Sequence, residues 1–257
     1  MSTENNKNRG PLSFSAVGAM ALKDNLFRYF EKMGLNPLVT EEWKRGIFQL
    51  FGIKTINLPN FDADNYILAS NHISDFDAVI LGLLHPQIRI IAKMEWVSNP
   101  DLNEFLRLHY NIVGIYRDSE IEKLDEENKR AAKEHNYKVT IDALKHLKDG
   151  DRPRHLLIFP QGTISDINKN SLARINPGFG KIARMTKTRI VNIFLEYPKM
   201  DDITRIVGSS PYVAEGADHA RIWLDGVISL QNQLKNVRTP VLSEKHSLNN
   251  SPDEPYF

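Results

Sequence analysis

The chain has 257 residues, of which 41% are hydrophobic, so it can bury a substantial core as one large domain. Its formal net charge of +1, with acidic and basic residues interspersed, gives no electrostatic signature of nucleic-acid binding. The absence of cysteine excludes disulfides, thiolate nucleophiles and zinc sites with cysteine ligands, and it fits a reducing compartment such as the cytosol.

Residues 1–55 are expected to form an N-terminal amphipathic helical segment. Apolar residues recur at helical spacing over residues 19–33, and a second apolar stripe over residues 43–51 is interrupted by acidic and basic residues. Such stripes more often pack into a core, but aromatic residues beside Lys and Arg also suit a helix that lies on a membrane surface. Neither a signal peptide nor a transmembrane helix is predicted.

Five β-rich runs follow, at residues 66–69, 88–92, 112–116, 155–159 and 190–195. Helices are expected between most of them, at residues 76–84, 103–108, 120–147 with a break near His135, and 179–185. This alternation predicts an α/β fold with a mixed, largely parallel β-sheet flanked by helices. We expect one catalytic domain over residues 56–246, with its chemistry at strand ends, and a frayed tail at residues 247–257.

The end of the first predicted strand carries His72 and, five residues later, Asp77. Five positions on one helix rotate about 140°, so these side chains can meet only if the chain turns from strand to helix between them. A carboxylate on one ring nitrogen fixes the tautomer and leaves the other nitrogen as a general base. His146 and Asp151 have the same spacing, but we interpret His146 as a solvated residue at a helix end. A structural histidine is the alternative for His72.

Two further predicted strands end on cations. Lys93 follows the run 88–92, and Arg117 follows the run 112–116. Each alone is as consistent with a surface ion pair, but two cations at the edge that carries His72 indicate an anion site. Lys supplies a point charge there, and Arg supplies a bidentate fork for phosphate or carboxylate.

The fourth predicted strand ends in Phe159-Pro160-Gln161-Gly162-Thr163. A Pro-x-Gly turn can direct backbone N–H groups and the Thr hydroxyl at a ligand, which makes it a second wall of the site. The later segment 177–181 lacks the Gly-Lys-Ser/Thr ending of a phosphate loop, so we interpret it as a turn that opens a helix.

With these four blocks, residues 66–195 resemble the glycerol-3-phosphate and lysophosphatidate acyltransferase family. The segment 71–77 matches the Asn-His-x4-Asp (HX4D) block of that family, and residues 159–163 match its Phe-Pro-Glu-Gly-Thr block except at Gln161. Lys93 with Glu95 fits a Lys-x-Glu pattern, and Arg117 fits the arginine that closes the second block.

The resemblance implies an α/β enzyme that moves a fatty acyl group from a coenzyme A or acyl-carrier-protein thioester to a hydroxyl of lysophosphatidate or glycerol 3-phosphate. It implies His72 as base, Asp77 as its orienting group and no covalent acyl-enzyme. The substrate would be bound by Lys93, Arg117, Gln161, Gly162 and Thr163.

The resemblance also implies a membrane-associated catalytic domain, so we expect a cytoplasmic protein peripheral to the inner face of the membrane. Its expected partners are a lipid acceptor, acyl-CoA or acyl-carrier protein as co-substrate, and the membrane surface. The residues agree with direct attack, because the chain has no Gly-x-Ser-x-Gly elbow and no cysteine. Backbone N–H groups near Gly162 are the candidate donors to the developing oxyanion. No metal site and no permanently bound cofactor are predicted.

Departures from the family pattern concern the acceptor more than the catalyst. Gln161 replaces a glutamate, Ile164 replaces an arginine associated with acceptor phosphate, Asn111 replaces a common glycine, and the block at residues 190–194 lacks its usual proline. Three alternatives therefore stay open: an acyltransferase for an amine, sugar or amino-acid lipid, a non-catalytic lipid-binding protein on the same fold, and a thioester hydrolase.

Overall fold

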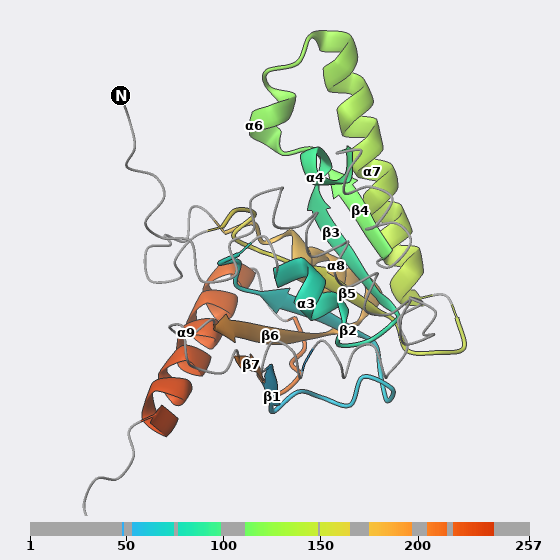
Figure 1. Ribbon diagram of the computed structural model, residues 1–257. Coiled ribbons are helices and arrows are strands. Elements are labelled where there is room, and N and C mark those ends of the chain that lie inside the picture. Colours follow the sequence, from blue (N-terminus) through green and yellow to red (C-terminus); the bar gives the residue numbers. More distant parts are fainter. Residues whose placement is uncertain are drawn as a thin grey trace, which may run out of the picture.

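A seven-stranded sheet forms the centre of the computed structural model, which describes residues 48, 53–74, 77–98, 111–148, 150–164, 175–196, 205–214 and 218–238 (Figure 1). The strand order within this part of the chain is β1-β7-β6-β2-β5-β3-β4. The strands are β1 Lys54–Ile56, β2 Tyr66–Ser70, β3 Ile88–Lys93, β4 Asn111–Ile115, β5 His155–Ile158, β6 Arg189–Glu196 and β7 Arg205–Gly208.

Five neighbouring strands, from β6 to β4, run parallel, whereas β7 is antiparallel to β6 and β1 is parallel to β7. The carboxyl ends of β6, β2, β5, β3 and β4 therefore meet at one edge of the sheet. In open α/β sheets, ligands bind at this edge. The expected mixed, largely parallel α/β sheet is confirmed.

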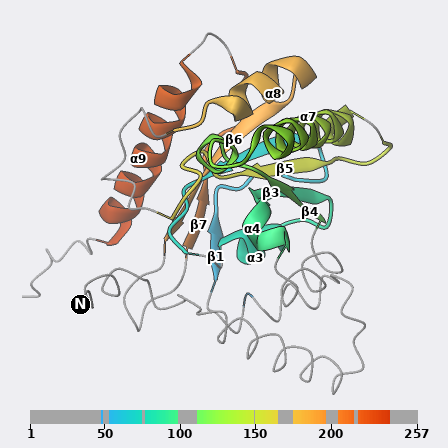
Figure 2. The same ribbon diagram turned by 90° about the horizontal axis from the view of Figure 1, so that it is seen from above.

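Helices cover both faces of the sheet (Figure 2). They are α3 Asp77–Gly82, α4 Met94–Ser98, α6 Asp118–Ile121, α7 Glu126–Lys148, α8 Gly178–Thr186 and α9 His219–Arg238. One face packs under α3 and α4, and the other packs under α7, α8 and α9. β2 is buried at every position because both faces are covered, which explains its continuous apolar sequence.

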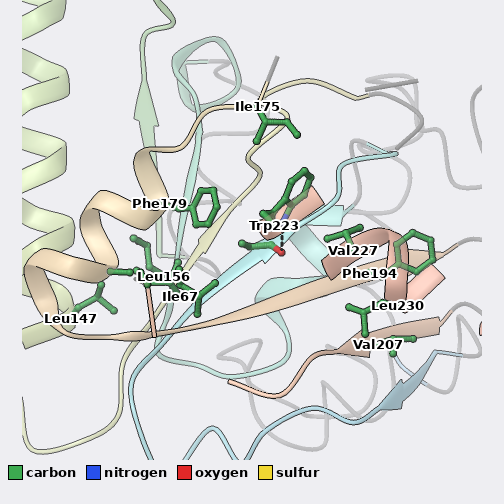
Figure 3. Close-up of a cluster of buried hydrophobic side chains, with 14 of the residues drawn as sticks. Ile67, Leu147, Leu156, Ile175, Phe179, Phe194, Val207, Trp223, Val227 and Leu230 are labelled. Carbon is green, nitrogen blue, oxygen red and sulfur yellow. Dashed lines mark hydrogen bonds between the residues drawn. The ribbon is translucent and has the colours of Figure 1, made fainter. Parts of the chain in front are cut away.

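The second core joins α8 and α9 to the central strands (Figure 3). Trp223 of α9 is fully buried, and its indole N–H donates to the carbonyl of Ala69 in β2 over 2.9 Å. Gly226, one turn further along α9, lies so close to β6 that a Cβ there would come within 2.1 Å of the Asn192 side-chain nitrogen. These contacts fix α9 against β2, the strand that leads to His72, and against its neighbour β6.

The sequence located the five parallel strands to within about two residues, and the helical turn expected at residues 177–181 is the start of α8. The break near His135 is wrong, because α7 continues through that residue and the interruption lies at residues 122–125 instead. The strands β1 and β7 and the helix α9 were not predicted. β1 also straddles the expected domain boundary at residues 55 and 56.

Several expectations fall on residues outside the described ranges: the helices at residues 19–33 and 103–108, and the tail at residues 247–257. Of the second N-terminal stripe, Phe48 is described; it is helical and packs against the core beneath α3. No helix in the described ranges combines the length and apolar character needed to cross a bilayer.

The interpretation of His146 as a solvated residue is wrong. Its side chain is buried, and its Nε2 donates to the carbonyls of Gln87 and His155, each over 3.1 Å. His155 is also fully buried, at the sheet edge opposite His72, where its Nδ1 accepts the N–H of Tyr66. Burial, followed by the nearby His85, lowers the pKa of His155 to about 3.

The buried His155 should make the fold sensitive to acid. The unfolded ring takes up a proton below about pH 6.5, whereas the folded ring resists protonation until about pH 3, so stability falls as pH drops through this window. Replacing His155→Phe should reduce the slope of unfolding free energy against pH by about 1 kcal/mol per pH unit between pH 6 and 4. Urea unfolding at several pH values measures both slopes, and equal slopes would contradict the assignment.

Candidate active site

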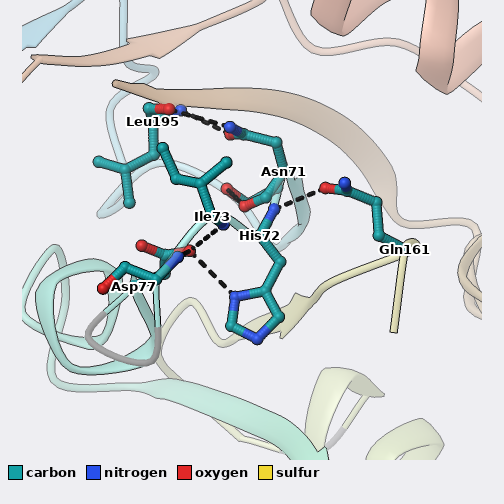
Figure 4. Close-up of polar contacts among 8 residues, drawn as sticks. Asn71, His72, Ile73, Asp77, Gln161 and Leu195 are labelled. Carbon is teal, nitrogen blue, oxygen red and sulfur yellow. Dashed lines mark hydrogen bonds and ion pairs between the residues drawn. The ribbon is translucent and has the colours of Figure 1, made fainter. Parts of the chain in front are cut away.

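His72 follows β2 and faces Asp77, the first residue of α3 (Figure 4). The distance from His72 Nδ1 to Asp77 Oδ2 is 3.0 Å. The same carboxylate oxygen accepts the backbone N–H groups of Ile73 over 2.7 Å and Ser74 over 3.0 Å. Asp77 is fully buried, so these three donors replace the water that its charge would otherwise need.

This contact determines which nitrogen of His72 can do chemistry. A carboxylate only accepts hydrogen bonds, so Nδ1 carries the proton and Nε2 keeps its lone pair. The imidazole stacks on the ring of Phe159, with centroids 4.4 Å apart, and its side chain is 17% exposed. The ring is therefore held in one orientation and is accessible to a bound group that gives up a proton.

Asn71 anchors the turn that carries His72. Its side-chain amide donates to the carbonyl of Leu195 over 2.9 Å and accepts the N–H of the same residue over 2.6 Å. The amide thus makes the two hydrogen bonds that the backbone of a neighbouring strand would make to β6. The backbone N–H of Asn71 also donates to the carbonyl of Ile193. The Asn71 side chain thus continues the hydrogen bonding between β2 and β6 beyond the last residue of β2, as far as His72.

The turn after β5 lies on the other side of His72. Gln161 is buried, and its side-chain oxygen accepts the backbone N–H of His72 over 2.6 Å. Gly162 has a φ of 62°, which favours glycine, and its N–H donates to the carbonyl of Phe159. The N–H of Gly162 is thus engaged within the turn. Thr163 is exposed at the tip.

The two predicted cations lie at the ends of the next two strands. Lys93 is the last residue of β3, and Arg117 lies two residues beyond β4 at the start of α6. The strand order β2-β5-β3-β4, with roughly 4.8 Å between neighbours, puts these strands about 10 and 14 Å from β2. Both cations lie at the sheet edge that carries His72. Because β5 lies between β2 and β3, their side chains must extend past β5 to contact a ligand that is bound at His72.

Arg117 is held by contacts of its own backbone and of the residue before it. Its own N–H donates to the Glu120 carboxylate over 3.0 Å, and the preceding residue, Tyr116, exchanges two hydrogen bonds with the side chain of Asn136 in α7. Within the described part of the chain, the Nη2 atom of Arg117 is buried and has no hydrogen-bond partner. An unpaired buried guanidinium nitrogen is costly, so this atom is suited to an anionic ligand.

Among the residues that the structure describes, no three His, Asp or Glu side chains gather in a way that could hold a metal ion.

The comparisons with known proteins identify the family of the chain. The family model described as Acyltransferase matches residues 52–196, more than half of the chain. The chain belongs to the Acyltransferase family. It is therefore an acyltransferase enzyme, and all seven predicted site residues lie inside the matched region.

A solved structure shares the fold of this acyltransferase. It is described as the crystal structure of the 1-acyl-sn-glycerophosphate (LPA) acyltransferase PlsC from Thermotoga maritima, and it matches with a TM-score of 0.50 over 88% of each chain at 18% sequence identity. No curated protein matches the sequence.

The structure adds positioning contacts that the sequence did not reveal. Asn71 stood inside the matched motif without an assigned role, while Phe159 was treated as part of a turn. Asn136 lies in the helix expected at residues 120–147, where the sequence assigned it no role. An amide that pairs with a distant strand leaves no periodic signal, because its partner is far away in the sequence.

Loss of the Asn71 amide should destabilise the acyltransferase. Asn71→Leu leaves the N–H and C=O of Leu195 without partners in a buried place, so the free energy of unfolding should fall by roughly 2–4 kcal/mol. Asn128→Leu is the control, because Asn128 is exposed and its side chain donates to the exposed Asp125, the residue before α7; its effect should stay below about 0.5 kcal/mol. Urea denaturation measures both, and equal effects would contradict the anchoring role of Asn71.

Proposed function

We propose that the enzyme transfers a fatty acyl group from a coenzyme A or acyl-carrier-protein thioester to a hydroxyl of lysophosphatidate or glycerol 3-phosphate. His72 acts as the general base and Asp77 orients it. The observation that carries the proposal is the bond between His72 and the fully buried Asp77, at the edge where the unpaired nitrogen of Arg117 also lies.

The reaction follows from the tautomer of His72. Nε2 takes the proton of the acceptor hydroxyl as its oxygen attacks the thioester carbonyl, and the new C–O bond gives a tetrahedral oxyanion. Collapse of this intermediate breaks the C–S bond, and the imidazolium returns the proton to the leaving thiolate. Asp77 stabilises the imidazolium while it exists and does not itself take the proton.

The acceptor's anionic group is bound by Lys93 and Arg117. The two side chains come from adjacent strands, so they hold one phosphate between a point charge and a planar fork. Gln161 is already bonded to the backbone of His72 and Ile164 is an exposed apolar residue, so neither adds charge to this end of the site. Gly162 and Thr163 form the exposed tip of the turn that faces the substrate.

The enzyme works at the inner face of the cytoplasmic membrane, to which it is peripheral. The support for this location is the nature of the lipid acceptor and the aromatic and basic composition of residues 1–55. The packing of Phe48 against the core ties the end of that segment to the catalytic domain.

Removal of the base should stop the reaction without unfolding the protein. His72→Ala should lower acceptor-dependent thiol release by about 10²- to 10⁴-fold. His85→Ala is a matched control, because His85 also bonds to an aspartate, Asp62, over 3.2 Å, but at the opposite edge of the sheet. Circular dichroism checks the fold of both variants. Turnover retained by His72→Ala would rule out His72 as the base.

Loss of the Arg117 guanidinium should weaken acceptor binding selectively. Arg117→Gln should raise KM for lysophosphatidate or glycerol 3-phosphate about 10- to 100-fold and leave KM for the thioester unchanged, because a charge-assisted hydrogen bond contributes roughly 1.5–3 kcal/mol. The control is Arg152→Gln, an exposed residue in the loop before β5.

The same assay separates the proposed acceptor from its rival. The apolar Ile164 favours an acceptor without phosphate, such as an amine, sugar or amino-acid lipid. Products from each acceptor, with each thioester donor, are identified by mass spectrometry. If the phosphate acceptors give only background thiol release while another lipid is acylated, the proposed acceptor is wrong.

A further inference from the structure

Gln161 joins the turn after β5 to the turn that carries the base (Figure 4). Its side chain is buried, and its oxygen accepts the backbone N–H of His72 over 2.6 Å. The turn is itself braced, because Gly162 donates to Phe159 and Asn176 donates to Pro160. Gln161 is therefore held in place by the turn when it binds the backbone of His72.

The turn holds His72 at two points. Phe159 packs against the face of the imidazole, and Gln161 binds the backbone of the same residue. Asp77 holds the ring from α3, and Leu195 of β6 holds Asn71, the residue before the histidine. Among these contacts, the bond from Gln161 is the one that fixes the backbone N–H of the histidine itself.

We propose that Gln161 is a positioning residue for His72, and that its amide also keeps the β5 side of the base uncharged. This inference rests on the proposed function and deepens it. It replaces the direct role in substrate binding that the motif predicted for Gln161, because the oxygen of the side chain is committed to the enzyme's own backbone.

The charge of this side chain matters because of the groups around the base. Asp77 from α3 already contacts the ring. The contacts of Phe159 and Gln161, from the turn after β5, are uncharged, and so is the pairing of Asn71 with Leu195 of β6. The remaining predicted site charges at this edge are the cations Lys93 and Arg117. The glutamate of the related motif would accept the same hydrogen bond, but it would place a second carboxylate beside the base. That charge would favour the protonated imidazole, which cannot act as a base.

Two substitutions separate geometry from charge. Gln161→Leu has a similar size but cannot accept the His72 N–H, so kcat should fall about 10- to 100-fold while KM for donor and acceptor stays within about threefold. Gln161→Glu keeps an oxygen that accepts the His72 N–H, so kcat should reach the wild-type value at high pH. The acidic limb of its kcat–pH profile should move up by about one pH unit. Gln87→Leu and Gln87→Glu are matched controls at the opposite edge of the sheet and should match the wild type.

Each outcome bears on the proposal. An increase in KM for the acceptor with unchanged kcat in Gln161→Leu would make Gln161 a substrate ligand and overturn its positioning role. A kcat–pH profile of Gln161→Glu that coincides with the wild type would overturn the charge argument. Thermal unfolding shows whether Gln161→Leu folds. If it does not, the isosteric Gln161→Glu variant still decides both points. A carboxylate oxygen also accepts the His72 N–H, so a kcat that stays low at every pH would contradict the positioning role.

The experiment also distinguishes this inference from the proposed function. If His72→Ala is inactive and both Gln161 variants behave as the wild type, only the role of Gln161 is wrong. If His72→Ala is active, the base itself is wrong, whatever the Gln161 variants show.

Discussion

The buried carboxylate of Asp77 is the group on which the rest of the site depends. A charge that is fully removed from water needs several donors, and here the donors include the His72 ring and two N–H groups of the turn between β2 and α3. The turn therefore folds around the Asp77 carboxylate, and the imidazole is one of the donors that stabilise this carboxylate. This explains why His72 and Asp77 lie five residues apart on a strand-to-helix turn and not on one helix.

Side-chain amides continue the hydrogen bonding of the sheet at places where the backbone bonds between its strands end. Asn71 pairs with both backbone groups of Leu195, Asn136 pairs with both of Tyr116, and Asn65 donates to the carbonyl of Leu147 and accepts the N–H of Arg154. Each amide has one donor side and one acceptor side, so it fits a backbone peptide as a neighbouring strand would. Two of these pairs lie at the edge that carries His72 and Arg117, where an active site needs rigid support.

The parallel strands were predictable because each one is a short apolar run between turn signals, and burial on both faces demands such a run. The strands β1 and β7 have only three and four residues, too few for a periodic signal. His146 was misjudged because its charged neighbours in sequence point to solvent, whereas its own position on α7 faces the start of β3 and β5. Helix α9 was missed although Trp223, Val227, Leu230 and Leu234 follow a helical pattern that its sequence contains.

The sequence by itself determined the α/β class, the order of the chemical blocks and the choice of His72 and Asp77 as a candidate pair, because these depend on local pattern and residue type. It could not determine which strands are neighbours, and strand order decides the rest. Inserting β5 between β2 and β3 brings Gln161 and Phe159 against His72 and puts Lys93 and Arg117 on the strands beyond. That order is set by the packing of helices on two faces of one sheet, an interaction between segments far apart in the chain, so only the tertiary structure decided it.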